Sequence, residues 1–204
     1  MAIKPILFNT EMVRVILDGR KDATRRIVKG FIPDDAVWGY TAFTPKGYIS
    51  CRGTFADGYG EKFFKLPCEP GDILYVRETW KKAPNGYYYY EDWQRNDIAD
   101  ITKWKPSIHM PKEAARIWLK VTDVRVERLQ DVTEDGAKAE GAIDNRGFIH
   151  SPENEYDRIH TAREHFIKIW NSTVKKSDLD RYGWSANPYV WVIEFERCEK
   201  PEGV

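Results

Sequence analysis

DGRKDATRR, the sequence of residues 18–26, decides how we interpret the fold of this 204-residue chain. Upstream of this stretch, apolar side chains recur at helical spacing at Met12, Val13, Ile16 and Leu17. Asn9 or Thr10 can cap the start of such a helix, and Gly19 can adopt the left-handed conformation that ends it. We therefore expect a helix, a sharp turn and then a strand from Ala23 to Val28.

A strand here would gather polar side chains on one of its faces. Because side chains alternate across a strand, Thr24 and Arg26 share one face and Arg25 lies on the other, while Lys21 approaches from the turn. A hydroxyl, an ammonium and a guanidinium on short elements suit anion binding or catalysis. The alternative is a surface turn with solvated charges, which the spacing alone favours because lysine and arginine are mostly exposed.

The pattern Gly19-x-Lys21-x-x-Thr24-x-Arg26 resembles the signature of the ASCH domain family, small domains of the PUA-like superfamily that are associated with RNA. Residues 129–141 are similar to the downstream helix of that family, and residues 191–195 are similar to its closing strand. The three blocks stand in the order of the family. The resemblance implies an α+β fold, a PUA-like mixed β-barrel with surrounding helices.

Two segments interrupt this pattern and are lacking in compact members of the family. Residues 30–67 are rich in glycine, proline and short aromatic runs, which predicts two or three short strands joined by turns. Residues 80–111 are polar and aromatic. We expect a single domain over residues 1–204, with insertions at about 30–67 and 80–111.

The strand patterns near residue 120 and near the end of the chain also favour a barrel. Ile117, Leu119 and Val121 share one parity, but Val124 and Val126 continue on the other, so we expect a bulge or bend at Thr122-Asp123. In the last strand, one face carries Tyr189, Trp191, Ile193 and Phe195 and the other carries Val190 and Val192, as in a strand that is covered on both sides.

Two helices are expected between these strands. Thr133 can cap a short helix that ends near Glu140, directly before Gly141. A further helix shows helical spacing around Phe166 and Trp170, with Asn171 as its expected end, and follows a polar loop that contains Ser151-Pro152.

Composition limits the possible partners and locations. The 32 basic and 32 acidic residues cancel, so nucleic-acid binding would need a local basic patch. The cysteines, at positions 51, 68 and 198, form no CxxC pair and indicate no disulfide framework. No apolar run approaches the roughly 20 residues of a membrane span, and a secretion signal is lacking at the start. We expect a cytoplasmic protein that does not bind membranes.

The resemblance assigns catalytic roles to the signature. One branch of the family resembles amidohydrolases that deacylate N4-acetylcytidine with a threonine nucleophile, a lysine base and a glutamate, which match Thr24, Lys21 and Glu140. A lysine acts as a base only when burial or a nearby cation lowers its pKa. Arg26 could supply that charge or hold an oxyanion, and Glu140 could protonate the leaving amine. Without net charge, a free nucleoside is the favoured substrate over folded RNA.

Other side chains near the signature are candidate contacts for the same substrate, namely Gly19, Arg26, Arg77, Glu78 and Trp80. In the second insertion, Tyr87–Tyr90 and neighbouring basic residues could stack on unpaired bases. The alternative, which we favour, is that these aromatic side chains pack as a lid onto the barrel. We expect residues 80–111 to cover or border the cleft that holds the signature.

Two further function classes stay open. A non-catalytic module that binds single-stranded RNA or a modified base would use Lys21 and Arg26 as ligand contacts. A metal-dependent ribonuclease is the third possibility, because some ASCH proteins are associated with such cleavage. Longer members of the family resemble prophage-encoded genes, which implies a phage-related role.

Metal ligands are weakly indicated. Asp22, Glu78 and Glu140 are the acidic residues that could serve a nuclease. His160 and His165 are five apart, which is not the spacing of facing residues on a helix. The chain also lacks a glycine loop of the kind that cradles phosphates, so we expect neither a metal nor another cofactor.

Overall fold

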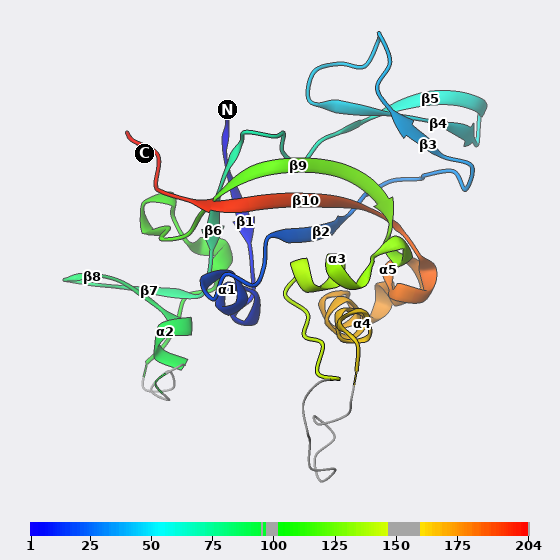
Figure 1. The fold of residues 1–204 in the computed structure, drawn as a ribbon. Helices are drawn as coiled ribbons and strands as arrows, with labels where there is room; N and C mark the ends of the chain where they lie inside the picture. Colours follow the sequence, from blue (N-terminus) through cyan, green and yellow to red (C-terminus); the bar gives the residue numbers. More distant parts are fainter. Residues whose placement is uncertain (95, 97–101, 147–159, 204) are drawn as a thin grey trace.

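A curved five-stranded sheet forms the body of the computed structural model, which describes residues 1–94, 96, 102–146 and 160–203 (Figure 1). β1 and β6 run parallel, and the other neighbours run antiparallel. Helices pack against this sheet, so the expected α+β class is confirmed. The strand order is β1 (Ile3–Leu7), β6 (Ile73–Arg77), β9 (Trp118–Arg128), β10 (Tyr189–Cys198) and β2 (Ala23–Ile27).

The helix and turn before β2 form as the sequence predicts. α1 (Thr10–Leu17) begins at Asn9, whose side-chain oxygen accepts a hydrogen bond from the Met12 N–H. Gly19 follows the helix with φ at 70°, a conformation that costs glycine little. The chain then enters β2 along the edge of the sheet.

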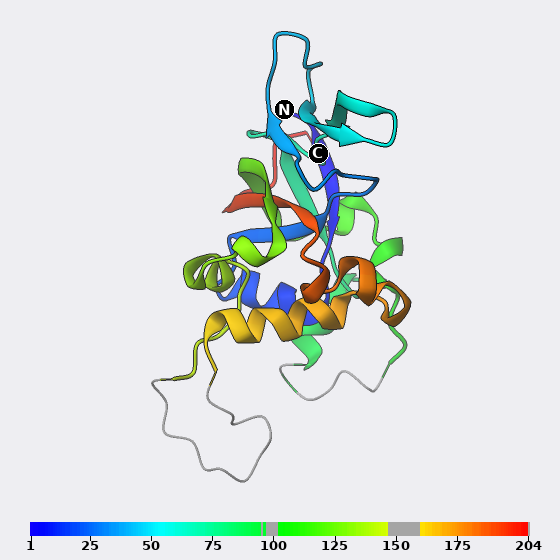
Figure 2. The same ribbon diagram turned by 90° about the vertical axis from the view of Figure 1, so that its right-hand side faces the viewer.

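The later helices are α3 (Glu134–Ala139), α4 (Ala162–Thr173) and α5 (Leu179–Tyr182), and α4 runs beneath the sheet (Figure 2). Thr133 caps α3 as expected, with its hydroxyl accepting from the Gly136 N–H. The expected end of α4 at Asn171 is wrong, because the helix continues to Thr173. The Asn171 side chain accepts a hydrogen bond from the Trp184 N–H. Ser151-Pro152 lies outside the described residues.

Both faces of β10 are buried, as predicted. Trp191, Ile193 and Phe195 face a core that α1 and β6 complete. Val190 and Val192 face a second core, which α3 and α4 complete. The last strand is therefore the wall that the two cores share.

A bulge in β9 explains the change of parity in its sequence. Glu194 pairs with Asp123, but the next residue, Phe195, pairs with Val121, so Thr122 is an extra residue in β9. This extra residue brings both Val121 and Val124 to the same core. The bulge predicted at Thr122-Asp123 is confirmed.

The expected closed β-barrel does not form among the described residues. The edge strands β1 and β2 have no backbone pairing with each other. One side chain bridges them, because Arg26 Nη2 donates a hydrogen bond to the Leu7 carbonyl oxygen at 3.0 Å. The sheet curves enough for the Arg26 side chain to span the space between its two edges, but the edges do not pair and the sheet stays open.

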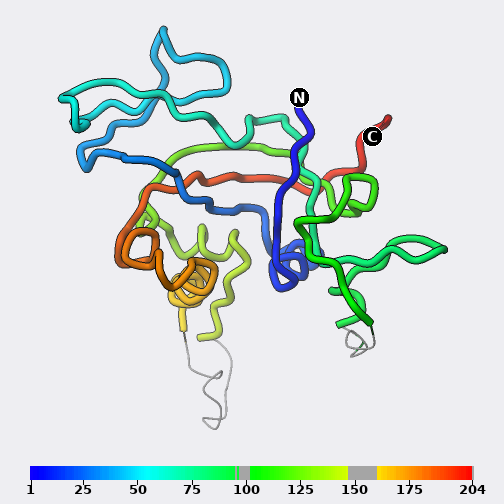
Figure 3. Tube along the Cα trace, turned by 180° about the vertical axis from the view of Figure 1, so that it is seen from behind, coloured from blue at the N-terminus to red at the C-terminus, as the bar shows by residue number. Residues whose placement is uncertain are grey.

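The two segments predicted as insertions form structures of their own. Residues 30–67 contain a three-stranded antiparallel sheet, which lies across the main sheet from α3 and α4 (Figures 1 and 3). Residues 80–111 contain a β-hairpin and a short helix. Their elements are β3 (Val37–Gly39), β4 (Tyr48–Phe55), β5 (Gly58–Lys65), β7 (Trp80–Ala83), β8 (Gly86–Tyr89) and α2 (Tyr90–Gln94).

Short 3₁₀ helices complete the described part of the chain at Ser107–His109, Lys112–Ala114, Leu129–Asp131, Lys176–Asp178 and Trp184–Ala186. None of the described helices is long and apolar enough to cross a membrane.

Candidate functional site

Lys21 and Glu140 form a buried ion pair between the turn before β2 and the end of α3. Lys21 Nζ donates to Glu140 Oε2 at 2.6 Å and to the Glu140 carbonyl oxygen at 2.9 Å. The Lys21 side chain is 0% exposed and that of Glu140 is 8% exposed. Two predicted catalytic residues that are 119 positions apart are thus brought into direct contact.

Gly141 fixes the position of Glu140. It has φ at 89°, and a Cβ built there would lie 2.7 Å from Val15 Cγ2 on α1. Glu140 is the residue that closes α3, so the end of this helix is pressed against α1 at the glycine. The close approach places the carboxylate beside Lys21, which follows α1 in the chain.

Thr24 and Arg26 lie side by side on β2, as their spacing predicts. They pair with Ile193 and Trp191 of β10. Arg26 Nη1 donates to Thr24 Oγ1 at 2.8 Å. Thr24 is only 1% exposed, so its hydroxyl is covered in this conformation.

Phe8 and Arg25 belong to the site but were not singled out from the sequence. The Phe8 ring lies 5.7 Å from Lys21 Nζ and 5.2 Å from Arg26 Cζ, within cation–π range of both. Arg25 Nη1 lies 3.5 Å from Glu140 Oε1, which accepts no hydrogen bond from the described residues. The position of Arg25 directly after Thr24 was the signal that could have identified it. The alternation of side chains along a strand, however, places Arg25 on the face opposite Thr24.

Burial lowers the pKa of Lys21 below its ordinary value, and Glu140 opposes this shift. Arg26 and Arg25 add smaller contributions that also lower the pKa of Lys21. Burial lowers the pKa of Arg26 as well, although a guanidinium stays protonated across the physiological range. Lys21 therefore meets one requirement for a base, an ammonium that loses its proton more readily than a solvated lysine does.

Lys21 does not contact the proposed nucleophile directly. The hydrogen bonds of its ammonium within the described chain go to Glu140, and the Thr24 hydroxyl is bonded to Arg26. Proton transfer from Thr24 to Lys21 would need Lys21 Nζ first to lose its proton and then to turn from Glu140 toward the hydroxyl.

A cleft opens where the two edges of the sheet approach each other. It has a volume of about 300 Å³ and includes Arg26 and Arg77, two of the predicted contacts. Lys21, Thr24 and Glu140 are not among its lining residues, and it contains no carboxylate. The cleft is lined by Lys4, Pro5, Ile6, Leu7, Arg26, Pro67, Cys68, Leu74, Arg77 and Ile193.

The first insertion borders this cleft, through Pro67. We expected residues 80–111 to cover or border it, but none of the described residues in that range lines it. One contact connects that insertion to the cleft wall, because Arg77 Nη1 donates to the Ile108 carbonyl oxygen at 3.3 Å. The insertion is held instead against α1, where Arg14 Nε donates to Glu91 at 2.8 Å.

The tyrosine run in that insertion packs against the protein. Tyr87 and Tyr89 contact a core cluster around Trp80. Tyr88 packs on Trp93 and Tyr90 packs on Trp104 in edge-to-face pairs, and all four tyrosines are half-buried. The packed alternative therefore fits this run better than free stacking platforms do.

Glu78 and Trp80 lie away from the signature. Glu78 is 2% exposed and pairs with Arg116 Nε at 2.9 Å, and burial raises the pKa of this carboxyl. Trp80 is buried in a core cluster that the second insertion shares with β6 and β9. Neither residue is among the residues that line the cleft at Arg26, so a role for them as substrate contacts stays a prediction.

The acidic residues nominated as metal ligands do not converge. Asp22 is exposed, whereas Glu78 and Glu140 are held by separate cations. His160 and His165 do meet, with ring centroids 5.0 Å apart. Even so, the described residues contain no group of three potential ligands that could hold a metal ion.

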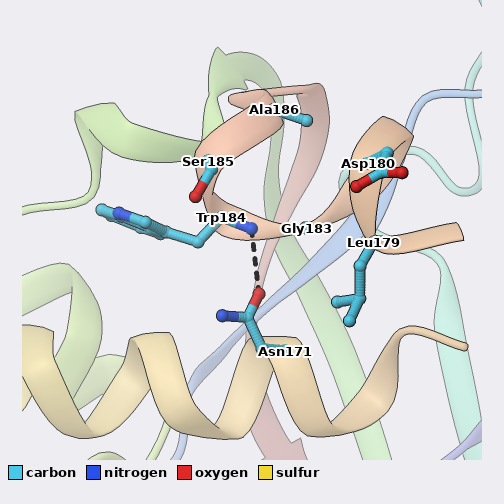
Figure 4. Close-up of a pocket in the computed structure, with 7 residues that line it drawn as sticks. All are labelled: Asn171, Leu179, Asp180, Gly183, Trp184, Ser185 and Ala186. Carbon is cyan, nitrogen blue, oxygen red and sulfur yellow. Dashed lines mark hydrogen bonds between the residues drawn. The ribbon is translucent and has the colours of Figure 1, made fainter. Parts of the chain in front are cut away.

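Another pocket lies at the end of α4, far along the chain from the signature (Figure 4). It has a volume of about 350 Å³ and includes one carboxylate, Asp180, and no cation. Asn171 and Trp184 join across it through a hydrogen bond of 2.9 Å. Its charge is therefore opposite to that of the cleft at Arg26.

Neither a family model nor a curated protein matches the chain. A solved structure described as "hypothetical protein PH0355" is similar over 97% of this chain and 100% of that one, with 14% sequence identity and a TM-score of 0.37. A similarity of this size carries no argument about fold or function.

Proposed function

We propose that this chain is an ASCH-type protein with a PUA-like fold. In this proposal it binds a nucleoside or a nucleotide of single-stranded RNA in the cleft at Arg26. The signature residues support the assignment, since Lys21, Thr24 and Arg26 lie together at the edge of a strongly curved sheet.

The observation that carries this proposal is the charge of the cleft. Arg26, Arg77 and Lys4 line it together with apolar side chains, and no carboxylate does. Lys4 is partly neutralised by Asp72 at 2.9 Å, so the two arginines supply most of the positive field. Cations around an apolar floor suit a phosphate that is joined to a base, and they supply the local patch that a neutral chain needs.

Calorimetric titration with cytidine 5′-monophosphate and with cytidine tests this binding. Arg77→Ala should weaken nucleotide binding about tenfold, because one charged hydrogen bond is worth about 1.5 kcal/mol. Lys120→Ala removes an exposed cation that pairs with Glu196, and it should have no effect. Failure of the wild type to bind either compound or N4-acetylcytidine at millimolar concentration would refute the proposal.

A second candidate, amide hydrolysis, is favoured by the lowered pKa of Lys21 and by the donor that Arg26 offers to Thr24. In this reaction Thr24 Oγ1 attacks the acyl carbon of an N-acylated cytosine while its proton passes to Lys21 Nζ. The C–N bond breaks as the amine takes a proton from the Lys21–Glu140 pair. Water then hydrolyses the threonine ester, and Arg26 stabilises the oxyanion in both steps.

Release of cytidine from N4-acetylcytidine measures this activity. Thr24→Ala should abolish turnover, whereas Thr24→Ser should keep a part of it because the hydroxyl remains. The rate should rise with pH as Lys21 loses its proton, at a pH below that expected for a solvated lysine. Full turnover by Thr24→Ala would exclude the mechanism, while binding without turnover would leave the binding function alone.

A further inference from the structure

We infer that a second pocket beside the cleft at Arg26 holds the next nucleotide of a single-stranded nucleic acid. The ligand would then be an oligonucleotide of at least two residues, held across both pockets. This inference rests on the proposed function of the cleft. It adds a subsite to which residues 30–67, the first insertion, contribute. Proteins that carry the signature without this insertion would lack the subsite and would not share its preference for oligonucleotides.

The second pocket lies next to the first. It has a volume of about 340 Å³, and Arg26 and Pro67 line both pockets. A ligand that contacts Arg26 from one pocket is therefore next to the other pocket. The second pocket is lined by Arg26, Ile27, Val28, Lys29, Phe64, Lys65, Pro67 and Trp191.

The charge of the second pocket repeats that of the first. Lys29 and Lys65 are exposed on its rim, and neither forms an ion pair with a carboxylate of the described chain. No carboxylate lines the pocket. Together the two pockets offer five basic side chains and no acidic one, in a chain whose formal net charge is zero. A ligand with regularly repeated negative charge fits this arrangement.

An aromatic floor accompanies these cations. Phe64, which is half-buried, and Trp191, which is 6% exposed, both line the pocket. Trp38 supports both rings edge-on, with centroid distances of 5.1 Å to Phe64 and 6.3 Å to Trp191. A rigid aromatic surface flanked by lysines is the combination that binds an unpaired base and its phosphate. An acidic peptide would use the lysines but would have no need of the aromatic floor.

Two residues of the second pocket come from β5, a strand of the first insertion. Phe64 and Lys65 are adjacent on β5, and they pair with Ile49 and Tyr48 of β4. Lys65 is exposed whereas Phe64 is half-buried and packs on Trp38, so the lysine can be changed without removing an aromatic contact. The double variant Lys29→Ala/Lys65→Ala therefore removes charge from the second pocket alone.

Fluorescence anisotropy with labelled six-residue oligouridine and oligothymidine tests this subsite, alongside calorimetry with the mononucleotide. The double variant should bind both oligonucleotides at least tenfold more weakly, with mononucleotide affinity unchanged. The slope of log affinity against log salt should fall by about 1.4, since each phosphate contact on a single strand contributes about 0.7. The matched control, Lys120→Ala/Lys138→Ala, removes two exposed cations that already have carboxylate partners, and it should bind as the wild type does.

Each outcome separates the second subsite from the first. Unchanged oligonucleotide binding by the double variant would overturn the second subsite and leave the proposed function in place. Failure of the wild type to bind mononucleotides and oligonucleotides would overturn both. Equal competition by an acidic hexapeptide would show that the two pockets bind anions in general, and it would overturn the inference. The ratio of RNA to DNA affinity identifies which of the two strands is the ligand.

Discussion

Removal of one partner from the Lys21–Glu140 pair tests the central contact of the site. We expect Lys21→Met to lower the free energy of unfolding by about 3 kcal/mol, because a carboxylate then stays buried without its main cation. Methionine keeps most of the volume of lysine, so the loss reports the charge and not a cavity. Glu140→Met should cost a similar amount.

The magnitude follows from the geometry of the pair. Unit charges 2.6 Å apart attract by about 6 kcal/mol at an effective dielectric constant of about 20. Desolvation of each ion costs several kcal/mol, so the intact pair contributes little net stability. Arg25 remains 3.5 Å from Glu140 when Lys21 is gone, which places the expected loss at the low end of the usual range of about 3–5 kcal/mol.

Urea unfolding followed by tryptophan fluorescence gives these free energies. The double variant should lose about 2 kcal/mol less than the sum of the single variants, since the second substitution removes the charge that the first left unpaired. Lys62→Met is the control, because Lys62 pairs with Asp57 at 3.5 Å on the surface and its loss should cost under about 1 kcal/mol. Additive effects, or a loss as small as that of the control, would refute the buried ion pair.

Two further predictions concern the scaffold around the site. Gly141→Ala and Gly71→Ala both place a side chain at positive φ, 89° and 87°, but a Cβ meets Val15 only at Gly141. We expect about 1 kcal/mol of destabilisation at Gly71 and roughly 1–3 kcal/mol more at Gly141, and equal losses would contradict the close packing at α1. Arg116→Leu should lower the free energy of unfolding by about 3–5 kcal/mol because it leaves Glu78 buried and unpaired, and chemical denaturation with the milder Arg181→Leu as control measures this.

The sequence predicted the local elements of this fold well, because each depends on neighbouring residues. The caps at Asn9 and Thr133, and the turn at Gly19, follow from side-chain hydrogen bonds and backbone freedom within one helical turn. The bulge at Thr122 was predictable because an apolar pattern that changes parity within one strand needs an extra residue if both halves are to face the same core.

Long-range features were less predictable. Whether β1 and β2 pair depends on how far the whole sheet curls, and this cannot be read from either strand. Arg25 joins the site because the end of α3 reaches around the edge of β2, which alternation along one strand does not reveal. The ion pair of Glu78 was not predicted for a similar reason, since its partner Arg116 is 38 residues away.

Arg26 connects the features that could serve binding and catalysis. Its guanidinium donates to the Thr24 hydroxyl and to the Leu7 carbonyl, and its side chain lines both pockets. An anion that binds this guanidinium would compete with both hydrogen bonds and so loosen the contact that covers Thr24. Substitution of Arg26 would therefore disturb the contact between the sheet edges, the hydrogen bond to the Thr24 hydroxyl and both pockets together. Arg77, Thr24 and Lys65 each touch only one of these features, so variants at those positions separate the candidate functions.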